Sequence, residues 1–324
     1  MDPLTDVLEL AGVAGAVLAH LVAHEPWGLD VDPQPGAVFH AVLAGTCWLH
    51  TTDAPASRLM PGDVVLLPTN LAHTLSSTPD APATPLETSI RTGVRTPEGA
   101  IELPGKGAVT RLLCGAYDYD HEVAHPLLSL LPGALYLTAG VTAHDGDVGA
   151  TLRLLQLELG GGQPGSRAAV ARLIDLLFVQ LVRAWMSTAQ DDEVSWLRAL
   201  HDPIVAEALA LLHQQPQRDW TVDALAAQTH ASRAALTRRF TKLVGEPPMS
   251  YLARWRMDVA AKRLRTTDDP VVVIANSVGY TSEYAFSRAF RRARGRPPGR
   301  YRTRARAGRE ARTPAVHRTE EPST

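Results

Sequence analysis

Residues 232–251 read SRAALTRRFTKLVGEPPMSY, and residues 282–301 read SEYAFSRAFRRARGRPPGRY. The two stretches are 50 positions apart, and eight of their positions carry the same residue in both copies. An internal repeat of this length indicates one supersecondary unit that has been used twice. The identical pairs are Ser232/Ser282, Ala235/Ala285, Arg238/Arg288, Phe240/Phe290, Gly245/Gly295, Pro247/Pro297, Pro248/Pro298 and Tyr251/Tyr301.

Each copy carries the signals of a helix-turn-helix. In the first copy, Thr221 can cap a short helix over 222–228, and Ser232 can cap a second helix over 233–244 by accepting from free backbone N–H groups. Gly245 and the proline pair behind it end that second helix. Two helices joined by a turn of about three residues are the helix-turn-helix motif. The second copy repeats this order, with its second helix expected over 283–294.

The second helix of each unit divides into an inward face and a free face. Leu236 and Phe240 are spaced to face the core in the first unit, as are Phe286 and Phe290 in the second. The free face offers cations for phosphates, bidentate donors for bases and small side chains that permit close approach to the major groove. The predicted DNA-binding residues are Arg233, Ala234, Thr237, Arg238, Arg239, Glu283, Tyr284, Ser287, Arg288, Arg291 and Arg292.

Residues 249–266 separate the two units. Because this stretch contains no Gly or Pro, it is predicted to form one helix. At about 1.5 Å per residue this helix is roughly 25–30 Å long. That length is close to the ~34 Å between successive major-groove faces on one side of a duplex. A single chain is therefore predicted to read two half-sites of double-stranded DNA, and the unlike free faces predict that the half-sites differ in sequence.

The charge of the chain is unevenly distributed. Residues 1–200 hold 10 Lys and Arg against 22 Asp and Glu, a net charge of −12, whereas residues 201–324 hold 22 against 12, a net charge of +10. A polyanion is attracted to the second part only. No apolar run is long enough to span a membrane, the first residues do not resemble a signal peptide, and two cysteines make a disulfide scaffold improbable. These features predict a cytoplasmic protein.

The N-terminal half is expected to be a small β-barrel with flanking helices. A helix is predicted over 2–10, then short β runs broken by Pro and Gly from Trp27 to Leu113, with a mobile loop over 79–107. Helices are predicted over 148–159 and 165–187. The fold class is therefore α+β, with an all-α C-terminal domain of two helix-turn-helix units joined by a linker helix. The predicted divisions are a sensor domain (1–145), a helical dimerisation segment (146–190), a DNA-binding domain (200–302) and a disordered tail (303–324).

The repeat resembles the AraC/XylS family of transcription regulators, and the resemblance covers about residues 204–302. It implies a sequence-specific, effector-controlled regulator, without enzymatic activity, that contacts RNA polymerase. It also assigns the base-facing positions to Ala234, Thr237 and Arg238 in the first unit, and to Glu283, Tyr284, Ser287 and Arg288 in the second. One departure is His230, which stands in the first turn where the family commonly has Gly. If that position is left-handed, a non-Gly residue costs on the order of 1 kcal/mol.

The segment from Gly62 through Pro68 to His73 resembles the second motif of cupin barrels. The first motif keeps His40 but has Val42 and Cys47 where metal-binding cupins have a second His and a Glu, which argues against a cupin dioxygenase or isomerase. The candidate metal ligands are His40, Cys47, His73 and Cys114, a set of imidazoles and thiols that suits zinc. The same residues fit a thiol-based redox sensor, or they are core residues.

An organic effector is the remaining alternative for the sensor domain, in a pocket predicted to be lined by Phe39, Trp48 and Leu66. The alternative to a regulator as a whole is a cupin metalloenzyme fused to a DNA-targeting module. Homodimerisation is predicted through residues 167–187, whose apolar stripe is wider than one packing surface requires. The signal, the operator and the direction of regulation are not specified by these patterns.

Overall fold

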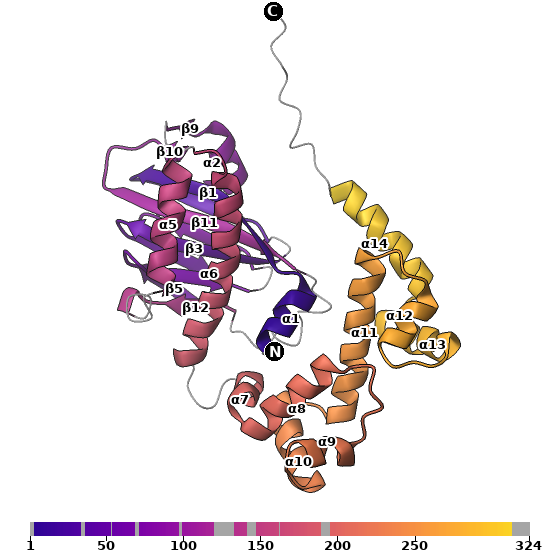
Figure 1. The fold of residues 1–324 in the computed structure, drawn as a ribbon. Coiled ribbons are helices and arrows are strands. Elements are labelled where there is room, and N and C mark those ends of the chain that lie inside the picture. The colour runs from indigo at the N-terminus through magenta and orange to yellow at the C-terminus, as the bar shows by residue number, and fades with distance from the viewer. Residues whose placement is uncertain are drawn as a thin grey trace, which may run out of the picture. The chain divides into compact units, whose positions relative to one another are not determined.

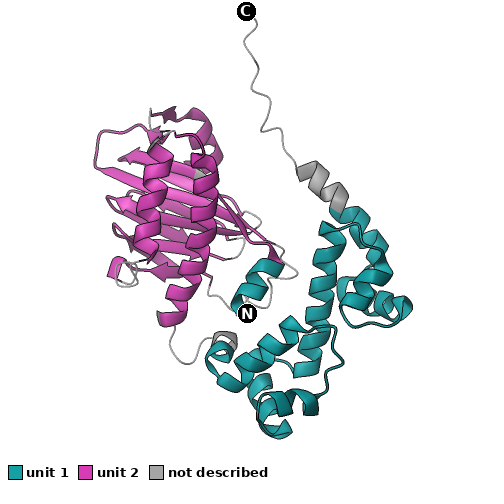
Figure 2. Ribbon diagram, viewed as in Figure 1, with its two compact units in different colours: residues 1–10, 195–324 teal, residues 11–194 magenta. Residues whose placement is uncertain are grey.

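The computed structural model describes residues 3–33, 36–52, 54–68, 71–96, 99–119, 133–140, 147–161, 163–188 and 195–312. The chain forms two compact units (Figure 2), one of residues 11–194 and the other of residues 1–10 together with 195–324. We call the first the sensor unit and the second the DNA-binding unit, after the roles that the sequence predicts for them. No helix among the described residues is long and apolar enough to cross a membrane.

The sensor unit contains two β-sheets, as the run of short strands predicts. Sheet A has seven strands, in the order β12-β6-β3-β11-β1-β10-β9, and sheet B has five, in the order β5-β4-β7-β2-β8. Sheet A consists of β12 (Leu135–Leu137), β6 (Val64–Leu67), β3 (Ala37–Ala44), β11 (Val109–Asp118), β1 (Ala14–His24), β10 (Ile101–Leu103) and β9 (Val94–Arg95). Sheet B consists of β5 (Ala54–Leu59), β4 (Cys47–Thr51), β7 (His73–Ser76), β2 (Gly28–Val31) and β8 (Thr84–Pro85).

The apolar core of the sensor unit lies between the two sheets. Alternate residues of the central strands enter it, among them Leu21 from β1, Val42 from β3, Leu49 from β4 and Leu112 from β11. Each of these side chains is at most 1% exposed. Because successive side chains of a strand point to opposite faces, the residues between them form a second face of sheet A.

Two helices cover that second face of sheet A, α5 (Asp147–Gly161) and α6 (Ser166–Thr188), as Figure 1 shows. The Tyr117 hydroxyl donates to the carbonyl of Ile174 at 3.1 Å, and the Tyr117 ring packs on Phe178 with 4.7 Å between centroids. Most of the apolar stripe of α6 is thereby buried within its own unit. Helices α5 and α6, which lie in the predicted dimerisation segment (146–190), group with the rest of the sensor unit.

Where the sequence predicts a mobile loop over residues 79–107, the described part of the segment forms a short helix and short strands. This segment contains β8, helix α2 (Leu86–Thr92), β9 and β10. Leu86, Ile101 and Leu103 belong to the core between the sheets. The Pro and Gly residues of this segment therefore separate short elements, of which α2 and β10 are held by buried side chains.

The DNA-binding unit is helical and includes the N-terminal helix α1 (Pro3–Ala11) up to Leu10. This membership differs from the predicted division, in which residues 1–145 form one domain. The other helices are α7 (Ser195–His201), α8 (Pro203–Gln214), α9 (Val222–Gln228), α10 (Arg233–Val244), α11 (Pro248–Thr266), α12 (Val271–Ser277), α13 (Glu283–Arg294) and α14 (Pro298–Arg312).

The predicted tail also begins differently. Helix α14 continues to Arg312, past the expected start of disorder at residue 303, and residues 313–324 lie outside the described chain. The helix is anchored at its first turn, where the Tyr301 ring packs edge-on against Phe290 with 5.3 Å between centroids. The following residues are mostly Arg and Ala, which are good helix formers, so the helix extends beyond this anchor.

Candidate DNA interface and sensor core

The two helix-turn-helix units form as the repeat predicts. The hydroxyl of Ser232 accepts from the N–H of Ala235 at 3.2 Å, and that of Ser282 accepts from the N–H of Ala285 at 3.3 Å. Gly245 and Gly295 end the second helices with φ angles of 86° and 71°. The sequence signals for the beginning and end of α10 and α13 are therefore satisfied in both copies.

The inward faces of α10 and α13 are buried as predicted, because Leu236, Phe240, Phe286 and Phe290 are each 0% exposed. Most of the predicted DNA-binding residues lie on the opposite, exposed faces. Ala234, Arg238, Glu283, Arg288, Arg291 and Arg292 are exposed, Thr237 and Ser287 are half-buried, and Tyr284 is 73% exposed.

Two of the predicted cations of α10 are already engaged within the unit. Arg233 Nη1 lies 3.2 Å from Asp223 Oδ2, with both side chains about two-thirds exposed. Arg239 Nη1 lies 3.2 Å from Asp202 Oδ2, at the cap of α8. An exposed pair such as the first costs little to open, whereas Arg239 lies beside the buried face. Arg239 is therefore the member of the predicted set that is least available to a duplex.

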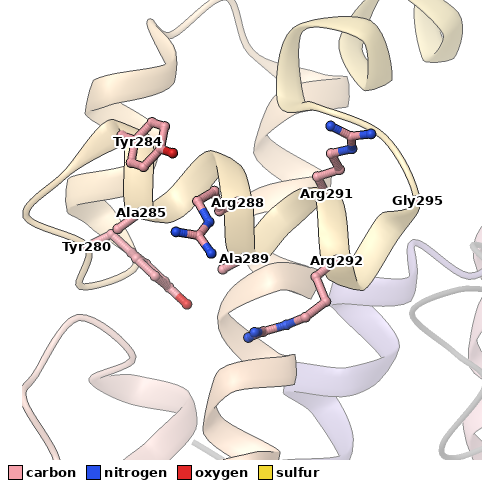
Figure 3. Close-up of a pocket in the computed structure, with 8 residues that line it drawn as sticks. All are labelled: Tyr280, Tyr284, Ala285, Arg288, Ala289, Arg291, Arg292 and Gly295. Carbon is pink, nitrogen blue, oxygen red and sulfur yellow. The ribbon is translucent and has the colours of Figure 1, made fainter.

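A groove of about 710 Å³ follows the free face of α13 (Figure 3). Arg288 lies between Tyr280 and Tyr284 in this view, and its guanidinium carbon is 5.9 Å from the centroid of the Tyr284 ring. The groove combines aromatic rings with guanidinium groups, which bind phosphates and donate to guanine edges. Its lining is Tyr280, Tyr284, Ala285, Arg288, Ala289, Arg291, Arg292 and Gly295. Tyr280 is a lining residue that the helical spacing of α13 could not reveal, because it precedes the helix.

The turns of the two units have the same geometry. Ala231 N–H donates to the carbonyl of Ala226 at 3.0 Å, and Tyr280 N–H donates to that of Ala275 at 2.9 Å. The residues just before these donors are His230 and Gly279, with φ angles of 50° and 85°. His230 therefore occupies a left-handed position that the second unit fills with Gly.

Charged side chains connect the linker helix α11 to the C-terminal ends of α10 and α13. Arg254 donates to Glu246, which follows α10, with 2.6 Å between Nη2 and Oε1. One turn further along α11, Asp258 forms ion pairs with Arg254 at 3.6 Å and with Arg294, in the last turn of α13. The Asp258 side chain is only 2% exposed. The ion pairs Glu246–Arg254–Asp258–Arg294 therefore fix the ends of α10 and α13 to the linker helix α11.

The predicted sensor residues fall into a connected and an unconnected group. His40 Nε2 and His73 Nε2 are 2.7 Å apart, and His40 Nδ1 is 3.0 Å from Cys114 Sγ. Cys47 shares the core between the sheets with Cys114, but no hydrogen bond joins it to the other three among the described residues. The described residues contain no group of three or more His, Cys, Asp or Glu side chains arranged to hold a metal ion.

The protons of this cluster can be assigned from one carbonyl. Burial lowers the pKa of both His40 and His73, so both rings are neutral. His73 Nδ1 lies 2.9 Å from the carbonyl oxygen of Leu71, which only accepts, so Nδ1 carries the proton of that ring. His73 Nε2 is then an acceptor, His40 Nε2–H donates to it, and the Cys114 thiol donates to His40 Nδ1.

The residues of the predicted effector pocket do not meet. Phe39 and Leu66 are partners in the register of β3 and β6 and are 0% exposed, on the face of sheet A that the helices cover. Trp48 belongs to sheet B, between Cys47 and Leu49, whose side chains enter the core. By alternation its side chain lies on the outer face of that sheet. Packing of Phe39 against Tyr117, at 5.5 Å between centroids, shows a core role.

A unit of two β-sheets joined to a helical unit with two helix-turn-helix motifs is the architecture expected of a two-domain DNA-binding regulator. Family models match on both parts, a cupin model over residues 2–187 and a helix-turn-helix domain model over residues 225–304. A putative AraC-like transcription regulator of Streptomyces lividans is 36% identical over 304 residues, which is 93% of this chain and 98% of the relative.

A second relative, the HTH-type transcriptional regulator AlkR of Acinetobacter baylyi, is 30% identical over 93% of this chain and 99% of its own length. Among solved structures, the DNA-binding domain of AdpA in complex with a target DNA is 33% identical, covers 34% of this chain and 97% of that one, and gives a TM-score of 0.32. The chain belongs to the AraC family of transcription regulators, with an N-terminal cupin domain. It is a DNA-binding transcription regulator.

Proposed function

We propose that DNA binding by this regulator is controlled by a thiophilic signal at the cluster of His40, His73 and Cys114, which we call the sensor cluster. The supporting observation is the hydrogen bond of the Cys114 thiol to His40, 3.0 Å long, inside an otherwise apolar core. Buried polar groups are costly unless paired. A reagent that takes the thiol proton therefore disturbs the one polar chain of the described core that links β3, β7 and β11.

Two reagents share this chemistry. Zinc would be held by the Cys114 thiolate with His40, His73 and Cys47 as further donors, and its binding would displace the thiol proton. A peroxide oxidises the thiol, so that the Cys114 thiol and hydrogen peroxide become a sulfenic acid and water. The neutral imidazoles suit either role, since the acceptor nitrogen of each ring now takes part in a hydrogen bond that either reagent would break. His40 faces its two partners through opposite nitrogens, so one zinc ion requires its ring to rotate.

The thiols themselves are protonated at neutral pH. Burial raises the pKa of Cys47 to about 12, and burial together with the nearby Cys47 raises the pKa of Cys114 further. His40 is the group placed to accept the thiol proton, for good if a metal ion takes the thiolate and transiently while the thiolate attacks peroxide, where the proton ends in the water formed. The account therefore requires His40 as well as Cys114.

The test uses the full chain and its best selected duplex. DNA affinity is measured after reduction, after addition of one equivalent of zinc, and after treatment with hydrogen peroxide. We expect one of the two reagents to change the affinity at least fivefold in the native protein and to have no effect on Cys114→Ser or His40→Phe. An equal response in Cys114→Ser would refute the proposal, as would no response to either reagent.

We further propose that the regulator acts in the cytoplasm as a homodimer that contacts RNA polymerase, as its family resemblance implies. Support for a dimer comes from apolar side chains on the outer surface of α5 and α6, where Leu154, Leu157 and Leu176 are 49%, 71% and 45% exposed. Burying three leucines on self-association is favourable by roughly 1.5–3 kcal/mol for each. Sedimentation at micromolar concentration should show a dimer that Leu157→Asp converts to monomer; a monomeric native protein would refute this.

A further inference from the structure

A second cavity lies within the sensor unit, away from the sensor cluster. Its volume is about 610 Å³, and it occupies the space between sheet A and the hairpin of α5 and α6. The elements around it, β1, β9, β10, α5 and α6, can be followed in Figure 1. Ligand pockets commonly have volumes of about 300–1,000 Å³. The cavity is therefore large enough for a small organic molecule.

Small side chains keep this end of the interface between sheet and helices open. Ala16 and Ala19 of β1 and Ala171 of α6 line the cavity. Elsewhere on the same face of sheet A, the layer is filled by Tyr117 and Phe178, whose rings are in contact. In the part of the layer beside the cavity, the lining instead includes Gly15 of β1 and Val170 and Ala171 of α6.

Gly15 marks the boundary between the filled and the open part. A Cβ there would lie 2.1 Å from Ile174 Cγ2, so only Gly lets α6 approach the strand at this point. The N–H of Gly15 also donates to Asp175 Oδ1 at 3.0 Å. The cavity therefore has a wall fixed by hydrogen bonding, which favours a preformed site over a packing defect.

Two buried polar atoms of the lining residues have no hydrogen-bond partner in the described structure. They are His20 Nδ1 and Ser166 Oγ. Burial and the neighbouring Arg111 lower the pKa of His20, so its ring is neutral and acts as a hydrogen-bonding group. A buried polar atom left unpaired costs about 1–3 kcal/mol. A ligand with polar atoms would remove that cost.

The charged residues of the lining are unequal in number. Arg95 and Arg167 provide two guanidinium groups, and Glu158 provides one carboxylate. In the described part of the chain, none of these three forms an ion pair. The remaining lining residues include Ile101, Leu159 and Val170, which are apolar. The site therefore combines an apolar body with a net positive rim.

We propose that this cavity binds an amphipathic organic anion, with its apolar part against Leu159, Val170 and Ala171 and its acidic group near Arg95 and Arg167. In this proposal, His20 Nδ1 and Ser166 Oγ form hydrogen bonds to the polar atoms of the ligand. This site is separate from the sensor cluster, and ligand binding to it can be measured without DNA. Only an effect of the ligand on DNA affinity rests on the proposed signal control.

The probe is 1-anilinonaphthalene-8-sulfonate, an apolar bicyclic amine with one sulfonate, titrated fluorimetrically into the full chain without DNA. N-phenyl-1-naphthylamine has the same body without the sulfonate and reports the contribution of charge. We expect saturable one-site binding of the sulfonate, at least fivefold tighter than that of the neutral dye. Equal affinity for the two dyes, or no saturable binding, would overturn the proposal.

Variants locate the bound dye. Arg167→Ala should weaken sulfonate binding at least fivefold, whereas Arg153→Ala, an exposed arginine of α5 that does not line the cavity, should leave it unchanged. Ala171→Leu, which adds volume inside the cavity, should weaken both dyes alike. Circular dichroism checks that each variant is folded. If Ala171→Leu folds and binds the dyes like the native protein, the site lies elsewhere and the proposal fails.

Discussion

His230 is the residue at which the two copies of the repeat differ most in backbone strain. Its φ of 50° lies in the left-handed region, and its counterpart in the second turn is Gly279 with φ 85°. The left-handed conformation costs a non-Gly residue roughly 1–2 kcal/mol, part of which Gly loses again to unfolded-chain entropy. Replacing His230 by Gly should therefore stabilise the DNA-binding unit by up to about 1 kcal/mol in calorimetric unfolding.

The reverse change provides the matched control. In Gly279→Ala the new Cβ would lie 2.8 Å from the carbonyl oxygen of Gln217 and 2.9 Å from Arg256 Nη2. Strain and steric overlap together should destabilise the unit by more than about 2 kcal/mol. If His230→Gly were destabilising by a similar amount, the backbone assignment of the first turn would be wrong.

His213 makes the DNA-binding unit sensitive to acid. Its ring is buried, stacks on Trp255 at 3.7 Å between centroids, donates from Nδ1 to Asp6 of α1 at 3.2 Å, and accepts from the Tyr251 hydroxyl at 2.6 Å. Burial lowers the pKa of His213, outweighing Asp6, which raises it, and Arg254 lowers it further. The folded unit therefore holds the neutral imidazole.

The sign of the pH dependence follows. With the folded pKa below the unfolded value of about 6.5, the unfolded chain binds more protons between the two values. The stability is fully present above pH 6.5 and falls as the pH drops through that window, by at most about 1.4 kcal/mol per pH unit. Calorimetry of the full chain from pH 7.5 to 5.0 should show this loss, and His213→Gln should show less of it. Parallel losses in both proteins would contradict the assignment.

At the scale of elements, the linker helix α11 determines how the two reading helices are held. Asp258→Asn removes the anion from the chain Glu246–Arg254–Asp258–Arg294, so Arg294, whose side chain is 8% exposed, loses its ion pair with Asp258. Breaking a buried ion pair in this way costs about 3–5 kcal/mol. We expect Asp258→Asn to lower the stability of the unit by that order in calorimetric unfolding.

An exposed pair serves as the comparison. Asp223→Asn breaks the Asp223–Arg233 contact, in which both side chains are about two-thirds exposed, and should change stability by less than about 1 kcal/mol. Comparable effects of the two substitutions would show that the buried chain of charges does not stabilise the unit.

The helices of the repeat were predictable because their signals are local. Ser caps, Gly ends and the i, i+4 spacing of Leu236 and Phe240 involve neighbours in sequence, and the structure confirms them. The chain Glu246–Arg254–Asp258–Arg294 was not predictable, since it joins residues up to 48 positions apart. In the sensor unit, alternation alone could not show that Phe39 and Leu66 face the helices, because every residue from Ala37 to Val42 is buried.

At the scale of the whole molecule, the uneven charge of the sequence broadly matches the two units. The sensor unit is acidic and the DNA-binding unit is basic. The N-terminal helix α1 is an exception, because it lies in the acidic part of the sequence but belongs to the DNA-binding unit. It is held there by the Asp6–His213 contact and by a 2.7 Å hydrogen bond from Lys262 to the carbonyl of Glu9. No periodicity within residues 3–11 could predict this, because both partners lie more than 200 positions away.

The central claim is that one chain reads two unlike half-sites through α10 and α13. It is tested most directly by selecting the preferred duplex of the full chain from random sequence, then repeating the selection with Arg238→Ala and Arg288→Ala. Each variant should lose about 1–3 kcal/mol of discrimination at one base pair, and the two affected base pairs should lie about one helical turn apart. A uniform loss of affinity across sequences, or relaxation of the same base pair by both variants, would contradict the account.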